Sequence, residues 1–93
     1  KICTQTGTAL NIFVDTNQLI DQGNQHRSCN QPEEALKCYA LAFAQDRSSS
    51  AAFNNYGNVL REVGEPQAAI PFLDRAIQLE PQNVTARFNL SLI

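Results

Sequence analysis

A chain of 93 residues with a net charge of −2 has room for one small domain at most. Apolar residues make up 43% of it, which is ordinary for a soluble fold, and no apolar run approaches the roughly 18 residues of a membrane span. The seven Lys and Arg residues are scattered, so the basic footprint of a nucleic-acid-binding protein is absent. We expect neither a membrane span nor a nucleic-acid partner.

The cysteines and the single histidine offer little metal or redox chemistry. Cys3, Cys29 and Cys38 include no CxxC pair, and His26 leaves a zinc site short of ligands. We expect reduced thiols in a reducing compartment, hence a cytoplasmic protein, with a Cys29–Cys38 disulfide as the alternative. The chain begins at Lys1, contains no Met and ends inside a periodic apolar segment, so we expect a fragment of a longer protein.

The N-terminal flank, residues 1–15, has the weakest pattern. Thr, Gly and β-branched residues disfavour a helix up to Thr8. The apolar residues that follow show no clear period, and we expect a helix from about Ala9.

A first pair of helices is predicted over residues 16–29 and 32–46. Pro32 suits a first helical position, and the acidic Glu33 and Glu34 interact favourably with the helix dipole there. The second helix has an apolar stripe at helical spacing, made by Ala35, Leu36, Tyr39, Ala42 and Phe43.

A second pair is predicted over residues 50–63 and 66–79, after a polar break rich in N-cap residues. Gly64 is expected to cap the first of these helices in a left-handed conformation. Pro71 removes a backbone hydrogen bond and should kink the second helix locally. Pro81 ends it.

The two pairs recur with an offset of 34 residues, which places Gly23 on Gly57 and Pro32 on Pro66. A fifth helix, from near Asn83 to Ile93, starts the pattern again. Further positions that coincide are Ala35 with Ala69, Leu36 with Ile70, Ala42 with Ala76, Phe43 with Ile77, Asn55 with Asn89, and Tyr56 with Leu90. The predicted units are residues 16–49, 50–83 and 84–93.

A 34-residue helix–turn–helix period resembles that of tetratricopeptide repeats. The central unit matches the family consensus at Phe53, Tyr56, Gly57, Leu60, Gly64, Ala69, Leu73, Ala76 and Pro81. The first unit keeps Gly23, Ala35, Tyr39 and Ala42, but departs at Leu19, Gln22 and Arg47. The resemblance implies an all-α tetratricopeptide repeat solenoid: antiparallel helix pairs in a right-handed superhelical stack, with two full repeats and the start of a third.

Catalysis finds little support in the sequence. There is no credible Ser-His-Asp arrangement, glycine-rich phosphate loop or HExxH motif. Glu33 and Glu34 are adjacent on a helix and point roughly 100° apart, so they do not form an acid–base pair. His26 is better explained as a helix-surface or packing residue than as a general base. We predict no catalytic residue, no metal site and no cofactor.

The resemblance implies a peptide-binding groove lined by the first helix of each pair. The first unit would supply Asn17, Ile20, Asp21, Asn24 and Arg27, the second Ala51, Asn54, Asn55, Asn58, Arg61 and Glu62, and the third Thr85, Phe88, Asn89 and Leu92. Asn is over-used in this set. Because an amide offers both a donor and an acceptor, an Asn row can bind the backbone of an extended peptide.

Asn55 and Asn89 stand one repeat apart, with Asp21 at the matching position before them. This arrangement is similar to the asparagine ladder of O-linked N-acetylglucosamine transferases, the alternative being amides that are merely solvated. The carboxylate clamp that binds chaperone C-termini is excluded, because Ile20, Thr85 and Asn89 replace its basic residues and leave a carboxylate without charged partners.

The sequence therefore predicts a non-catalytic protein–protein interaction scaffold that binds a protein or peptide partner. One alternative is the repeat region of a larger enzyme, such as a glycosyltransferase, that presents protein substrates to a catalytic domain elsewhere. Another is a self-assembly module, because Leu90, Leu92 and Ile93 have no second helix to cover them. Further repeats, and end-to-end or swapped homo-oligomers, are expected from this open end.

Overall fold

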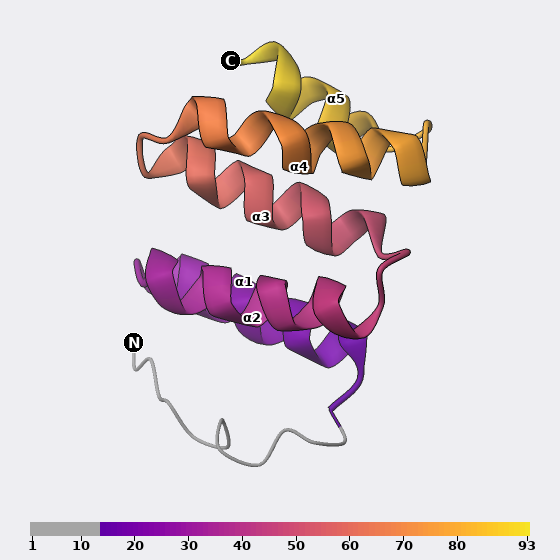
Figure 1. The fold of residues 1–93 in the computed structure, drawn as a ribbon. Coiled ribbons are helices and arrows are strands. Elements are labelled where there is room, and N and C mark those ends of the chain that lie inside the picture. Colours follow the sequence, from indigo (N-terminus) through magenta and orange to yellow (C-terminus); the bar gives the residue numbers. More distant parts are fainter. Residues whose placement is uncertain (1–13) are drawn as a thin grey trace.

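The computed structural model describes residues 14–93, and that part of the chain is all-α. Its helices are α1 (Thr16–Ser28), α2 (Pro32–Gln45), α3 (Ser50–Glu62), α4 (Pro66–Leu79) and α5 (Val84–Ser91). Figure 1 shows α1 with α2 and α3 with α4 as two stacked hairpins, and α5 lying over the second. The predicted helix from Ala9 falls outside the described residues, apart from its last positions.

The first helix of each unit begins at a side-chain cap, and the caps repeat with the same offset of 34. Asp15, Ser49 and Asn83 each accept a hydrogen bond from the backbone N–H three residues later. Such caps satisfy amide groups that the helix itself leaves unpaired. The periodic spacing of the caps therefore fixes where each first helix starts.

The turn inside each hairpin also repeats. Asn30 has φ +60° and Gly64 has φ +93°, both in the left-handed region. The next residue donates its N–H to a carbonyl in the last turn of the helix, Gln31 to His26 and Glu65 to Leu60, each at 2.8 Å. This is the Schellman closure of a helix C-terminus, for which glycine and asparagine are the favoured residues.

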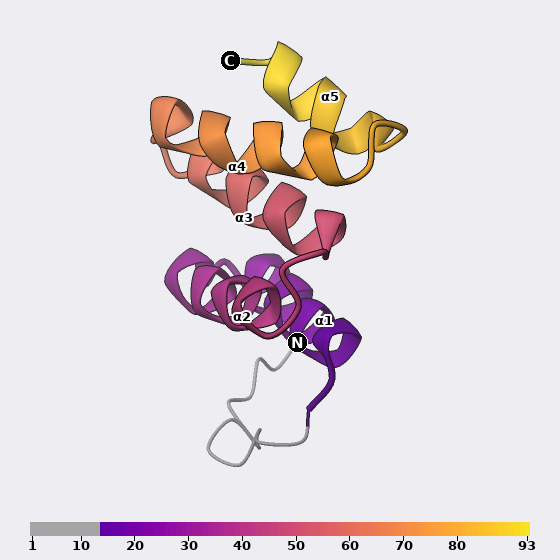
Figure 2. The same ribbon diagram turned by 45° about the vertical axis from the view of Figure 1, so that its right-hand side comes forward.

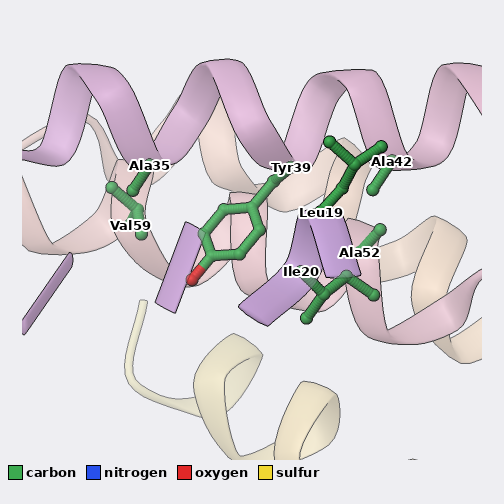
Figure 3. Packing of buried hydrophobic residues seen from close by; sticks show 7 residues of the cluster. All are labelled: Leu19, Ile20, Ala35, Tyr39, Ala42, Ala52 and Val59. Carbon is green, nitrogen blue, oxygen red and sulfur yellow. The ribbon is translucent and has the colours of Figure 1, made fainter. Parts of the chain in front are cut away.

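Each hairpin is held by close contact between a glycine and a large side chain. A Cβ added to Gly23 would collide with the ring of Tyr39, and one added to Gly57 would lie 2.8 Å from Leu73 Cγ. Tyr39 and Leu73 are fully buried. Figure 3 shows the Tyr39 ring among the residues that join the first hairpin to α3, which are Leu19, Ile20, Ala35, Ala42, Ala52 and Val59.

An aromatic cluster joins the two hairpins. The Phe43 ring of α2 stacks on Phe53 of α3, with ring centroids 4.5 Å apart. It meets Tyr56 edge-on at 5.3 Å, and Phe72 of α4 packs on Tyr56 at 4.5 Å. Such pairs add roughly 0.5–1.5 kcal/mol each beyond their area burial. The cluster therefore contributes to the docking of one unit on the next.

The predicted boundaries of α1 to α4 are confirmed within one residue, and the predicted end of α5 differs by two. The fifth helix ends at Ser91 instead of continuing to Ile93, because the last N–H groups bond three residues back, as Ile93 does to Leu90 at 3.2 Å. The fourth helix runs through Pro71 without a break. In the part of the chain that is described, no helix has the length and apolarity to cross a membrane.

The cysteines differ from both readings of the sequence. Cys38 is a buried free thiol, so the alternative Cys29–Cys38 disulfide is not formed. Burial raises the pKa of the Cys38 thiol above its ordinary value, with a smaller contribution from Glu34. Cys29 is disulfide-bonded, so the expectation of reduced thiols is wrong at that position. The cysteines therefore no longer support the expectation of a reducing compartment.

Candidate functional site

The first helices of the units lie side by side. α1 contacts α3, and α3 contacts α5. Figures 1 and 2 show the stack running from the first hairpin through α3 and α4 to α5. We name the surface that α1, α3 and α5 share the first-helix face. The candidate site residues belong to these three helices, except Leu92, which directly follows α5.

Two of the candidates, Arg27 on α1 and Glu62 on α3, bind each other. Arg27 donates from Nε to Glu62 Oε1 at 2.9 Å and from Nη2 to Oε2 at 2.6 Å, the bidentate geometry of a guanidinium on a carboxylate. This hydrogen bonding lowers the pKa of Glu62 and raises that of Arg27. Both side chains are about two-fifths exposed, at 41% and 39%. They connect neighbouring first helices at their C-terminal ends.

A second lateral connection joins α3 to α5. Asn89 donates from Nδ2 to Asn54 Oδ1 at 3.0 Å. Only 5% of Asn54 and 4% of Asn89 is exposed, and Asn54 also donates to Asn55 at 3.3 Å. The structure therefore places Asn54 and Asn89 inside the contact between helices, where they hold the stack together. Asn55 is half-buried beside them.

Ile20, Asn54 and Phe88 occupy equivalent positions in the three units, but their burial differs. Ile20 belongs to the core cluster with 9% exposure, and Asn54 is covered by α5. Phe88 is 62% exposed. In the first two units, the side chain at this position faces the first helix of the next unit. It therefore contributes to packing between helices as well as to the first-helix face. The consensus register alone does not reveal that role.

The other candidates remain accessible on the first helices. Asn17, Asp21, Asn24 and Thr85 are exposed, and Asn58 and Arg61 are half-buried. Two of these amides are already oriented by hydrogen bonds to their oxygens. Tyr39 donates its hydroxyl to Asn24 Oδ1 at 2.5 Å, and Arg61 donates from Nη2 to Asn58 Oδ1 at 2.6 Å.

A cavity of about 440 Å³ opens between α4 and α5, lined by Ile77, Arg87, Leu90 and Ser91. With the offset of 34, three of these residues match Phe43, Phe53 and Tyr56 of the aromatic cluster, which Phe72 completes. The exposed apolar side chains of Val84 and Phe88 lie on α5, and that of Leu92 directly follows it. Of the three residues that the sequence predicted to be uncovered, Leu92 is exposed, whereas Leu90 and Ile93 are half-buried, and the cavity was not predicted.

The three residues considered for catalysis, His26, Glu33 and Glu34, are packed or paired within the fold, or exposed to solvent. His26 is 7% exposed, and its Nδ1 lies 2.8 Å from Gln31 Oε1 at the turn between α1 and α2. Glu34 is 3.9 Å from Lys37 on its own helix, and Glu33 is exposed. Within residues 14–93, no three His, Cys, Asp or Glu side chains gather closely enough to hold a metal ion.

Stacked helix hairpins with caps, turns and inter-helix contacts repeated every 34 residues define an α-helical repeat solenoid. A family model described as tetratricopeptide repeat matches residues 20–84. The chain therefore belongs to the tetratricopeptide repeat family, and the fold predicted from the sequence is confirmed. Among curated proteins, none matches the sequence. Members of this family generally bind protein partners.

Proposed function

We propose that this chain is an interaction scaffold that binds an extended peptide segment of a partner protein along the first-helix face. The observation that supports the proposal most directly is the pair Asn24 and Asn58. They stand at equivalent positions of α1 and α3, both are accessible, and both have their side-chain oxygens fixed by internal hydrogen bonds. The Arg27–Glu62 bridge holds the two helices together one turn further along.

Fixed amides are suited to a peptide backbone. An amide whose oxygen is occupied still offers N–H groups to a carbonyl oxygen. Because the rotamers are held before binding, less conformational entropy is lost when the peptide binds. The partner's backbone would then supply the acceptors, and no bond is made or broken. The same face would present a protein substrate if the chain served as the repeat region of a larger enzyme.

The test compares binding of Asn24→Ala/Asn58→Ala with wild type on an array of 12-residue peptides taken from random sequences. The control is Gln67→Ala/Lys37→Ala, at exposed positions of α4 and α2. Loss of peptide signal in the first variant alone, with both variants folded by circular dichroism at the assay temperature, supports the proposal. Full retention of binding by Asn24→Ala/Asn58→Ala excludes this part of the face.

Self-association is the second candidate, favoured by exposed apolar side chains on and just after α5. Val84 and Phe88 of α5 are 72% and 62% exposed, and Leu92 just after the helix is 50% exposed, next to an open cavity. Large exposed apolar side chains on one element favour association. Sedimentation at rising concentration would show an increase in mass that Phe88→Ser reduces. A constant monomer mass at high concentration contradicts it.

A further inference from the structure

We propose that the bound peptide carries an acidic residue, Asp or Glu, whose carboxylate pairs with Arg61 at the C-terminal end of α3. This inference rests on the proposed function, since it names the chemistry of the peptide that the first-helix face accepts. Three features of the described residues carry it: the distribution of charge around Arg61, the state of its guanidinium, and the direction of the nearby hydrogen bonds.

The charges near Arg61 do not cancel. Glu62, the adjacent carboxylate, has one oxygen bound by Arg27 Nε and the other by Arg27 Nη2. Glu62 is thus already neutralised by a cation from the other helix. Within residues 14–93, Arg61 itself makes no ion pair and bonds only to the neutral amide of Asn58, at 2.6 Å. One positive charge therefore remains uncompensated beside the closed bridge.

The guanidinium of Arg61 is also only partly satisfied. Its Nε is shielded from solvent and has no hydrogen-bond partner, although the residue as a whole is half-buried. Partial removal from water strengthens a pairing between opposite charges, because the effective dielectric constant falls. An incoming carboxylate would bind a cation that has less water to give up than an exposed arginine has.

The neighbouring amides present donors and not acceptors. Asn58 must turn its oxygen to Arg61, because a guanidinium can only donate, and this leaves the Asn58 N–H groups available. Asn24, at the equivalent position of α1, likewise gives its oxygen to the Tyr39 hydroxyl. A surface of amide donors around one unpaired cation is complementary to a carboxylate.

Asp21 indicates at which end of the first-helix face the acidic residue of the peptide binds. It is exposed on α1, three residues before Asn24, and therefore lies one turn nearer the N-terminal end of the same helix. A carboxylate on the peptide would be repelled near Asp21 and attracted near Arg61. The preferred site for the acidic residue is therefore the end of the face where α1 and α3 finish.

The experiment uses peptide arrays as the probe. Each peptide has 12 residues drawn at random from Ala, Gly, Ser, Thr, Val and Leu, with one central residue fixed as Glu, Asp or Gln. The proteins compared are wild type, Arg61→Gln and Arg61→Lys, with Arg75→Gln as the control, because Arg75 is an exposed arginine of α4. Melting of each variant by circular dichroism confirms that it is folded.

We expect wild type to bind Glu or Asp peptides about tenfold more tightly than Gln peptides, as one charge-assisted hydrogen bond would give. Arg61→Gln should remove this preference without weakening the Gln peptides, Arg61→Lys should keep part of it, and Arg75→Gln all of it. Raising the salt concentration should reduce the preference.

Equal binding of Glu and Gln peptides by wild type, or a preference that survives in Arg61→Gln, overturns the acidic-residue proposal while leaving the scaffold function intact. Absence of binding to every peptide overturns the scaffold function and this proposal with it.

Discussion

Asn89 on α5 donates a 3.0 Å hydrogen bond to Asn54 on α3, and both amides are buried. These residues are 35 positions apart, as are Arg27 and Glu62. The sequence repeat is one residue shorter, so it aligns Asn89 with Asn55 instead. Lateral contacts between first helices thus use positions that face each other across two units, not equivalent positions. The asparagine row therefore includes a structural pair, Asn54 and Asn89, that connects α3 to α5.

Asn89→Ala should lower the free energy of unfolding by about 1–3 kcal/mol, because it leaves the buried Asn54 oxygen without its donor. Denaturant unfolding monitored by circular dichroism measures the change. Asn17→Ala is the control, since Asn17 is exposed on α1 and its loss should cost about 0.5 kcal/mol or less. Equal destabilisation by the two variants would contradict a structural role for the Asn89–Asn54 hydrogen bond.

The fold was predictable because its signals are local. Pro32 and Pro66 start second helices, Gly64 closes a turn, and the 34-residue offset places these elements in register. The roles of the site residues were not predictable in the same way. Asn54 and Asn55 are neighbours separated by roughly 100° around α3, so a modest rotation of the helix decides which is covered by α5.

The same limit applies to the ionic residues. Arg27 and Glu62 are recognisable in the sequence as polar residues of first helices, but their pairing depends on how α1 lies against α3. Arg61 differs from Glu62 by one position and remains without an ion pair among the described residues. The repeat register predicted that all three residues lie on the first helices. Only the packed structure shows that Arg27 pairs with Glu62 while the charge of Arg61 stays available.

Gly64→Ala should destabilise the chain by about 1–2 kcal/mol, because φ +93° brings a Cβ too close to the backbone. Gly64→Asn should cost less, since Asn30 adopts φ +60° at the equivalent turn of the first unit. Thermal melting of the two variants provides the comparison. An alanine variant as stable as the asparagine variant would show that the left-handed turn is not required.

Ala69→Leu should destabilise by about 1–3 kcal/mol through overpacking. Ala69 is fully buried, and its carbonyl oxygen would lie 3.3 Å from a Cβ on Gly57, so the two helices are already in close contact. Ala68→Leu is a matched control, because Ala68 is exposed at the preceding position of α4. An unchanged melting midpoint for Ala69→Leu would contradict the placement of this residue between α3 and α4.

The contribution of the Arg27–Glu62 bridge to folding stability should change with pH in the acidic range. The hydrogen bond from Arg27 lowers the folded-state pKa of Glu62 below the ordinary 4.5. The ionised carboxylate is therefore preferred in the folded state, so the contribution is present above pH 4.5 and is lost as pH falls through the folded-state pKa. Solvent screening limits it to about 0.2–1 kcal/mol.

Urea unfolding of wild type and Glu62→Gln at pH 7 and pH 3 measures this contribution. The difference in unfolding free energy between the two proteins should be larger at pH 7. Arg27→Gln should reduce the pH dependence in the same way, because it removes the donor that favours the carboxylate. A difference that stays constant between the two pH values would mean that the bridge adds nothing in solution.

Tyr39 should make stability depend on alkaline pH. Burial raises its pKa from 10.0 to about 12, because the phenolate is poorly solvated beside Gly23. The neutral phenol is preferred in the folded state, so the stabilisation is fully present below pH 10 and declines as pH rises through 12. By linkage, the loss across this window is about 1–3 kcal/mol.

Denaturant unfolding of wild type and Tyr39→Phe between pH 9 and pH 12 tests this dependence, with tyrosinate absorbance reporting ionisation. The variant loses the hydrogen bond to Asn24 at every pH, so it should start less stable, by about 0.5–1.5 kcal/mol. Because it cannot ionise at this position, its stability should decline less than that of wild type over the alkaline range. Parallel declines in the two proteins would show that Tyr39 ionises as readily in the folded chain as in the unfolded one.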